Sequence, residues 1–389
     1  FRSREWQSIF QSRPGDPIAT RYYSEALQAS GRFQESVEIL QEALAHFPEM
    51  ALLNIGLANG LLGLGNTEEG LALIDKVVAS DKAYRDQAID ILIHTLERMN
   101  GKKEPATAEQ LFRRLARLEP DSAYFLLQWA IALESLGRKE DAVAALKNAV
   151  VVGSGQDAET AAIHLDELLE PEERKAIWEA IFVELPYWNK NAPVDFPEDK
   201  VFMAIHYAKS LADANQLQDA IALLQKVHHS YPQNVSVQLA SGILQCRSGN
   251  IESGVQSIAG LLAVHPERRS QTLEEIEEVY NVLFDNGKYA AGEIMARSLI
   301  DLEPENPLRR FQLGETLYRQ ERHQEALEQF ELVLTVAPES PRTADRVDAI
   351  YEELQQPKAC VELWEQLTSI HPKSPVLKAH LEKAMNKTK

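Results

Sequence analysis

The chain has 389 residues, with 59 acidic and 40 basic side chains and a formal net charge of −19. This surplus of negative charge argues against nucleic-acid binding, which requires clustered lysine and arginine. Two cysteines are too few for a disulfide framework or a structural zinc site, and no apolar run approaches the ~18 residues of a membrane span. We therefore expect a soluble, folded, acidic protein without direct membrane insertion.

The chain begins with Phe1 rather than methionine, and no apolar signal-peptide core follows. We expect a processed or trimmed N-terminus. The sequence therefore leaves the compartment open: the cytoplasm is slightly favoured, and a removed signal or anchor is also compatible.

Prolines recur at a fixed interval along the chain. Pro304 and Pro338 lie 34 residues apart, and Ala326 and Phe330 precede Pro338 by twelve and eight residues. A period of roughly 20–50 residues indicates stacked repeats, each too small to bury its apolar face alone. Pairs with this spacing are Pro14 and Pro48, Pro232 and Pro266, Pro304 and Pro338, and Pro338 and Pro372.

The clearest unit is 307–340, which carries Gly314, Ala326, Phe330 and Pro338 in order. This pattern resembles the tetratricopeptide repeat (TPR) family, whose unit is a helix–turn–helix. The resemblance implies an all-α, right-handed superhelical solenoid of such repeats. Small residues would occupy the helix crossings, where a larger side chain forces the backbones apart. Glycines expected in the turn inside a unit are Gly31, Gly65, Gly137, Gly249 and Gly287.

The repeat frame divides the chain into five segments. The unit at 273–306 follows four inserted residues, because Pro266 and Pro304 are 38 residues apart. Residues 187–200 fit no repeat position, so an ordered loop and a hinge both remain open. The expected segments are the second helix of a truncated repeat at 1–16, an N-terminal block at 17–186 with a degenerate last unit, a linker or inter-repeat loop at 187–200, a C-terminal block of five repeats at 201–374, and a capping helix at 375–389, with Leu377, Leu381 and Met385 facing the last repeat.

No motif predicts catalysis, a cofactor or a metal. Residues 150–155 superficially resemble a strand entering a phosphate loop, but they lack the lysine and fall where a repeat ends. His228 and His229 are adjacent, yet no second pair of ligands accompanies them. We therefore expect a non-enzyme with no catalytic residue, no cofactor and no metal site.

The resemblance implies that the first helix of each repeat lines a concave groove. Carrying the family's inward positions over to this chain gives an acidic groove surface and an apolar one. A solvated helix face is the alternative for the acidic set, in which Glu274 would lie in a first helical turn favoured by the helix dipole. The acidic set is Glu274, Glu277, Asn281, Asp285, Glu315, Arg319, Asp345 and Glu352, and the apolar set is Phe202, Ile205, Leu239 and Ile243.

These surfaces predict a protein or peptide partner, with a basic segment held by the acidic set. No adjacent pair of units supplies the lysine, asparagine and arginine clamp with which some TPR proteins bind chaperone C-termini. The leading hypothesis is a non-catalytic scaffold that binds partner segments in the groove. The alternative is the regulatory or substrate-recruiting TPR region of a longer enzyme or of a secretion or assembly protein. The sequence leaves the oligomeric state open.

Overall fold

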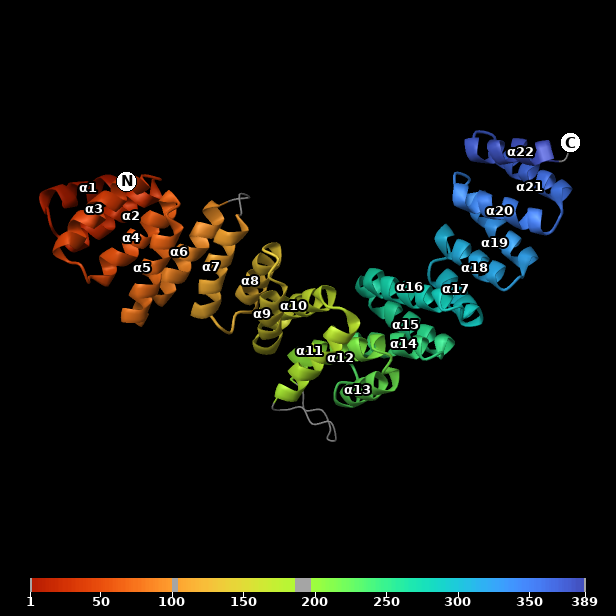
Figure 1. Ribbon diagram of the computed structural model, residues 1–389, viewed down its shortest axis with the longest axis horizontal. Coiled ribbons are helices and arrows are strands. Elements are labelled where there is room, and N and C mark those ends of the chain that lie inside the picture. Colours follow the sequence, from red (N-terminus) through yellow and green to blue (C-terminus); the bar gives the residue numbers. More distant parts are fainter. Residues whose placement is uncertain (1, 100–103, 186–196, 388–389) are drawn as a thin grey trace. The chain divides into compact units, whose positions relative to one another are not determined.

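The computed structural model describes residues 2–99, 104–185 and 197–387 (Figure 1). The regular elements in these ranges are 22 α-helices and three short 3-10 helices, without a strand. The predicted all-α architecture of helix pairs is confirmed. No helix in the described ranges is both long and apolar enough to cross a membrane.

The chain forms two compact units, residues 1–181 and 182–389. The division falls inside α11, before the predicted linker at 187–200. Residues 187–196 of that segment lie outside the described ranges, and 198–200 form a 3-10 helix. The helices of the first unit are α1 (Arg2–Ser12), α2 (Pro17–Ala29), α3 (Phe33–His46), α4 (Ala51–Leu64), α5 (Thr67–Ser80), α6 (Arg85–Arg98), α7 (Pro105–Leu118), α8 (Ala123–Ser135), α9 (Lys139–Val152), α10 (Gly155–Leu168) and most of α11 (Pro171–Glu184).

The second unit continues the alternation of first and second helices of a repeat. Within it, a first helix packs against the second helix of its own repeat, as α18 does on α19, and a second helix packs against the next first helix, as α17 does on α18. Its helices are α12 (Val201–Asp213), α13 (Leu217–Ser230), α14 (Val235–Arg247), α15 (Ile251–Val264), α16 (Arg269–Asp285), α17 (Tyr289–Leu302), α18 (Pro307–Arg319), α19 (His323–Val336), α20 (Pro341–Glu353), α21 (Pro357–Ile370) and α22 (Pro375–Lys387).

The close crossing of α18 and α19 depends on glycine at position 314, which has no side chain. A Cβ atom on Gly314 would lie 2.6 Å from Cε1 of Phe330, which is fully buried. One repeat earlier the sizes are exchanged: Tyr280 stands at the position of Gly314, and Gly292 and Ala296 stand at those of Ala326 and Phe330. Neither of these two repeats therefore has a large residue at both the first-helix and the second-helix position.

The five predicted turn glycines are confirmed, with φ between 70° and 97°. This left-handed backbone favours glycine, because a Cβ atom would meet the following carbonyl group. Asn215, Glu321 and Gln355 adopt φ of 57–61° at the same place in three other repeats.

The unit predicted at 273–306 keeps its register, because α17 begins 34 residues before α19, but its first helix begins earlier than residue 273. Helix α16 begins at Arg269 and is 17 residues long, so the four inserted residues extend its N-terminal end. Glu274 consequently lies beyond the first turn of α16, and the helix dipole does not explain its presence.

Candidate functional site

The predicted acidic residues lie on three first helices, α16, α18 and α20. Exposed side chains at these positions are Glu274, Asn281, Asp285, Arg319, Asp345 and Glu352. We call the exposed side chains of α16, α18 and α20 the first-helix surface.

Glu315 does not belong to this surface. Its residue is 7% exposed, and its two carboxylate oxygens accept hydrogen bonds from Arg346 Nε at 2.6 Å and Nη2 at 2.9 Å. The prediction that Glu315 contributes to the acidic groove surface is wrong, because a bidentate pair with Arg346 of the next first helix covers its carboxylate. The same hydrogen bond raises the pKa of Arg346.

Glu277 is half-buried and is also paired. Arg309 Nη1 lies 2.8 Å from Glu277 Oε2, and Arg309 Nε lies 2.6 Å from Glu303 Oε2. Arg309 itself is 4% exposed. Burial of this arginine requires carboxylate partners, since an unpaired buried charge is costly. Glu277 therefore joins α16 to α18.

Arginines on these helices also stack on aromatic rings. The Arg342 guanidinium lies 4.7 Å from the Phe311 ring centre, and that of Arg346 lies 4.6 Å from Tyr318. Arg319 lies 5.9 Å from Phe284. Sequence reasoning missed Arg309, Arg342 and Arg346, because it read only the family's inward positions. A carboxylate followed by arginine 31 or 32 residues later was an available signal for the two ion pairs.

Four carboxylates of the first-helix surface remain largely uncompensated. Among the described residues Glu274, Glu278 and Asp285 form no ion pair, and all three are exposed. Asp345 is 71% exposed at its side chain, and its one ion pair among the described residues is with His380 Nε2, at 3.9 Å. Glu278 was not among the predicted residues. The surface retains a negative excess over its exposed arginines, Arg269, Arg319 and Arg342.

The apolar set is divided by burial. Leu239 and Ile243 are each 7% exposed and belong to the hydrophobic core of the second unit. Their expected role as groove contacts is therefore wrong, because the core covers their side chains. Phe202 and Ile205 on α12 are half-buried and keep some accessible surface.

A buried carboxylate links the last three helices at the C-terminal end of the second unit. Asp348 on α20 is 6% exposed. It accepts hydrogen bonds from Trp364 Nε1 at 2.9 Å, His380 Nδ1 at 2.8 Å and Lys383 Nζ at 2.8 Å. Burial alone would raise the pKa of Asp348, but the bonds from His380 and Lys383 outweigh burial and lower it. Asp348 thus ties α20 to both α21 and α22.

The predicted capping helix is oriented slightly differently from expectation. Leu377 is fully buried and Leu381 packs against the core, as expected. Met385 is 42% exposed, and Ala384 is buried instead. The expectation for Met385 is wrong, because the apolar stripe of α22 passes through Ala384.

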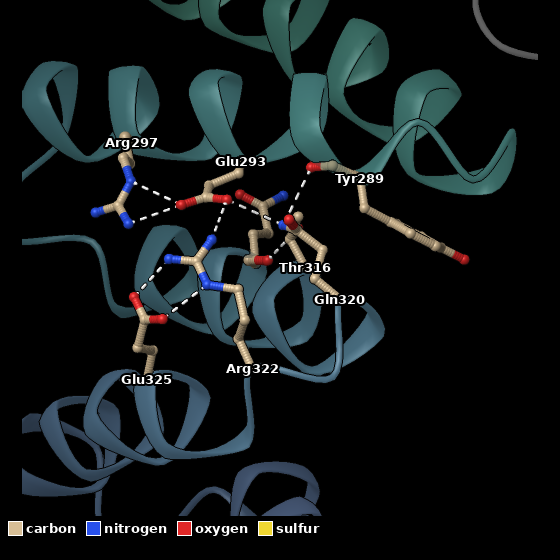
Figure 2. Close-up of polar contacts among 8 residues, drawn as sticks. Tyr289, Glu293, Arg297, Thr316, Gln320, Arg322 and Glu325 are labelled. Carbon is tan, nitrogen blue, oxygen red and sulfur yellow. Dashed lines mark hydrogen bonds and ion pairs between the residues drawn. The ribbon is translucent and has the colours of Figure 1, made fainter.

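A second charged cluster joins neighbouring repeats away from the first-helix surface. Glu293 on α17 accepts hydrogen bonds from Arg322 at 2.6 Å, Arg297 at 2.8 Å and Gln320 at 3.0 Å. Figure 2 shows these side chains converging from α17 and from the turn between α18 and α19. Burial would raise the pKa of Glu293, and its donors lower it. Because its acceptor oxygens are engaged, this cluster serves repeat packing rather than ligand binding.

His228 and His229 are exposed in the last turn of α13. Within the described ranges no three His, Cys, Asp or Glu side chains are grouped so that they could hold a metal ion.

The comparisons with known proteins agree with the repeat frame. Family models described as tetratricopeptide repeat match residues 10–92, 102–159, 205–234 and 281–341. The chain belongs to the tetratricopeptide repeat family. TPR arrays are protein-interaction scaffolds, and this chain has that general character. No curated protein matches the sequence.

Three of the similar solved structures each match nearly the whole length of this chain. "Structure of Naa15/Naa10 bound to HypK-THB" is 13% identical over 98% of this chain and 64% of that chain, with a TM-score of 0.32. This chain therefore spans less than two thirds of the length of that protein. The APC/C hetero-tetramer Cut9-Hcn1 is 11% identical over 98% and 92%, with a TM-score of 0.35. Yeast Tom70 is 13% identical over 99% and 92%, with a TM-score of 0.32.

Proposed function

We propose that the chain is a non-catalytic scaffold that binds a basic segment of a partner protein on the first-helix surface. The observation that carries this proposal is the distribution of charge. The half-buried Glu277 of α16 and the buried Glu315 of α18 are neutralised by arginine. The carboxylates that are left exposed on α16 and α20 are Glu274, Glu278, Asp285 and Asp345.

Like charges placed on neighbouring helices produce a field that adds up over the surface. Such a field attracts an oppositely charged segment and raises its association rate. The exposed arginines Arg319 and Arg342 stack on Phe284 and Phe311, which restricts where they can reach. A segment rich in lysine therefore fits this surface better than an acidic one.

Charge reversal on the first-helix surface is expected to weaken binding of a lysine-rich peptide. The variant combines Glu274→Lys, Asp285→Lys and Asp345→Lys. We expect at least a tenfold loss of affinity, or about 1.4 kcal/mol, because three attractive interactions become repulsive. The probe is a fluorescent twelve-residue lysine-rich peptide, and its anisotropy is titrated in low salt and at ~0.15 M salt, where the Debye length is about 8 Å.

The matched control carries Asp301→Lys, Glu328→Lys and Glu365→Lys on the second helices α17, α19 and α21. These three residues are exposed, so the control changes the net charge equally. It should keep most of the wild-type affinity. Equal losses in the two variants, or affinity that ignores salt, would contradict the proposed surface.

A further inference from the structure

We propose that a cavity between α20, α21 and α22 is an anchor pocket for one uncharged aromatic side chain of the bound partner segment. This inference rests on the proposed function, because it assumes that a segment lies on the adjoining first-helix surface. The cavity measures about 460 Å³ and is lined by Asp348, Tyr351, Glu352, Gln355, Pro357, Cys360, Lys383, Ala384 and Lys387.

Comparison with the preceding repeat explains why space is left there. Thirty-four residues before Glu352 stands Tyr318, and 34 residues before Ala384 stands Ile350. Ile350 is fully buried, and the Tyr318 hydroxyl donates to Glu353 at 2.6 Å. At the last interface a shorter acidic side chain and an alanine replace the aromatic ring and the isoleucine. The cavity therefore lies where the preceding repeat has a tyrosine ring and a branched apolar side chain.

The charges that line the cavity cancel in pairs. Lys383 Nζ lies 2.8 Å from Asp348, and Lys387 is paired with Glu352. A charged ligand group would have to compete with these pairs, one of which holds the buried Asp348, whereas an uncharged group leaves both pairs intact. Burial and the nearby Asp348 raise the pKa of Cys360 to about 11, so the thiol is neutral as well. The pocket thus favours an uncharged occupant.

The size of the cavity suits an aromatic ring. A cavity of about 150 Å³ is enough for benzene, and pockets for larger ligands measure roughly 300–1,000 Å³. The residues that line the cavity include Tyr351, Pro357 and Ala384. Aromatic residues are common anchors in protein interfaces, because they bury a large area with few rotatable bonds.

The cavity is continuous with the proposed binding surface. Glu352 lines the cavity and is also an exposed residue of α20, the helix that carries Asp345. A basic segment along α16 and α18 that continues past Asp345 therefore reaches the cavity. The partner class is a basic segment with one aromatic residue at its α22 end.

Filling the cavity tests the inference without a known partner. The probe is N-acetyl-tryptophanamide, titrated against the full chain by saturation-transfer NMR, with N-acetyl-alaninamide as the reference. We expect the tryptophan compound to bind and the variant Ala384→Ile, which restores the residue of the preceding repeat, to weaken it at least tenfold. Ala379→Ile makes the same change at an exposed position of α22 and should leave binding unchanged.

A folding control and a second cavity-filling variant show whether a loss of binding is caused by filling the pocket. Thermal melts should show that Ala384→Ile is folded, and Glu352→Tyr provides a second way to fill the space. The proposed anchor pocket would be refuted if N-acetyl-tryptophanamide bound no more tightly than N-acetyl-alaninamide. It would also be refuted if the tryptophan compound bound equally to the wild type and to both cavity-filling variants. The lysine-rich peptide would still respond to charge reversal in that case. If charge reversal did not change the affinity for the lysine-rich peptide, while N-acetyl-tryptophanamide still bound in the pocket, the proposed function would be refuted instead.

Discussion

Replacing Gly314 with leucine is expected to lower the free energy of unfolding by roughly 1–3 kcal/mol or more. The first atom of any side chain would lie 2.6 Å from Phe330 Cε1 and 2.8 Å from its Cζ, closer than carbon atoms can pack. Phe330 is fully buried and cannot rotate into solvent. Relief of the clash therefore requires α18 and α19 to separate.

Urea denaturation of the wild type and of Gly314→Leu measures this loss. The matched control is Gly260→Leu on α15, where an added Cβ would meet nothing within 4 Å and the residue is exposed. Leucine is also the better helix former, so the control should be neutral or stabilising. Equal destabilisation at both sites would show that the crossing of α18 and α19 is not tightly packed.

Replacing Asp348 with alanine is expected to cost about 2–3 kcal/mol. The variant leaves the indole N–H of the fully buried Trp364 without its acceptor, and it removes the link from α20 to His380 and Lys383 of α22. Asp345→Ala on the same helix is the control, because that side chain is 71% exposed and should change stability by less than about 0.5 kcal/mol. Equal effects of the two substitutions would refute a structural role for Asp348.

The contribution of Asp348 should also depend on pH. Its folded pKa is lowered below the ordinary value, because the bonds from His380 and Lys383 outweigh the effect of burial. A carboxylate of this kind stabilises the fold above its unfolded pKa of about 3.9. Its contribution is lost as the pH falls through the folded pKa. The stability difference between wild type and Asp348→Ala should therefore shrink below about pH 4.

The periodic part of the fold could be predicted because most repeats carry a proline and small residues at fixed positions in the sequence. Pro307 and Pro341 begin α18 and α20 where the 34-residue frame places them. The start of α16 could not be predicted from that frame, because the four inserted residues carry no proline or glycine that sets the boundary. An extension of a helix and an insertion in a loop have the same effect on proline spacing.

The site was harder to predict than the fold, because burial of a charge depends on the neighbouring repeat. Glu315 and Asp345 both stand at positions that the family pattern places inward, but only Glu315 meets an arginine within 3 Å. Asp348 replaces the glycine of the preceding repeat, and its partners His380 and Lys383 come from 32 and 35 residues away. A single repeat unit therefore shows which face a residue occupies and leaves its partner undetermined.

Photo-crosslinking of a lysine-rich peptide most directly tests whether α16, α18 and α20 bind the partner. The twelve-residue peptide carries one benzoylphenylalanine, and the crosslinked residues are mapped by mass spectrometry at low salt. Crosslinks should concentrate on the first-helix surface, near Glu274, Asp285 and Asp345, and disappear in the variant with these three charges reversed. Crosslinks concentrated on the second helices α17, α19 and α21, or unchanged in that variant, would contradict binding at the first-helix surface.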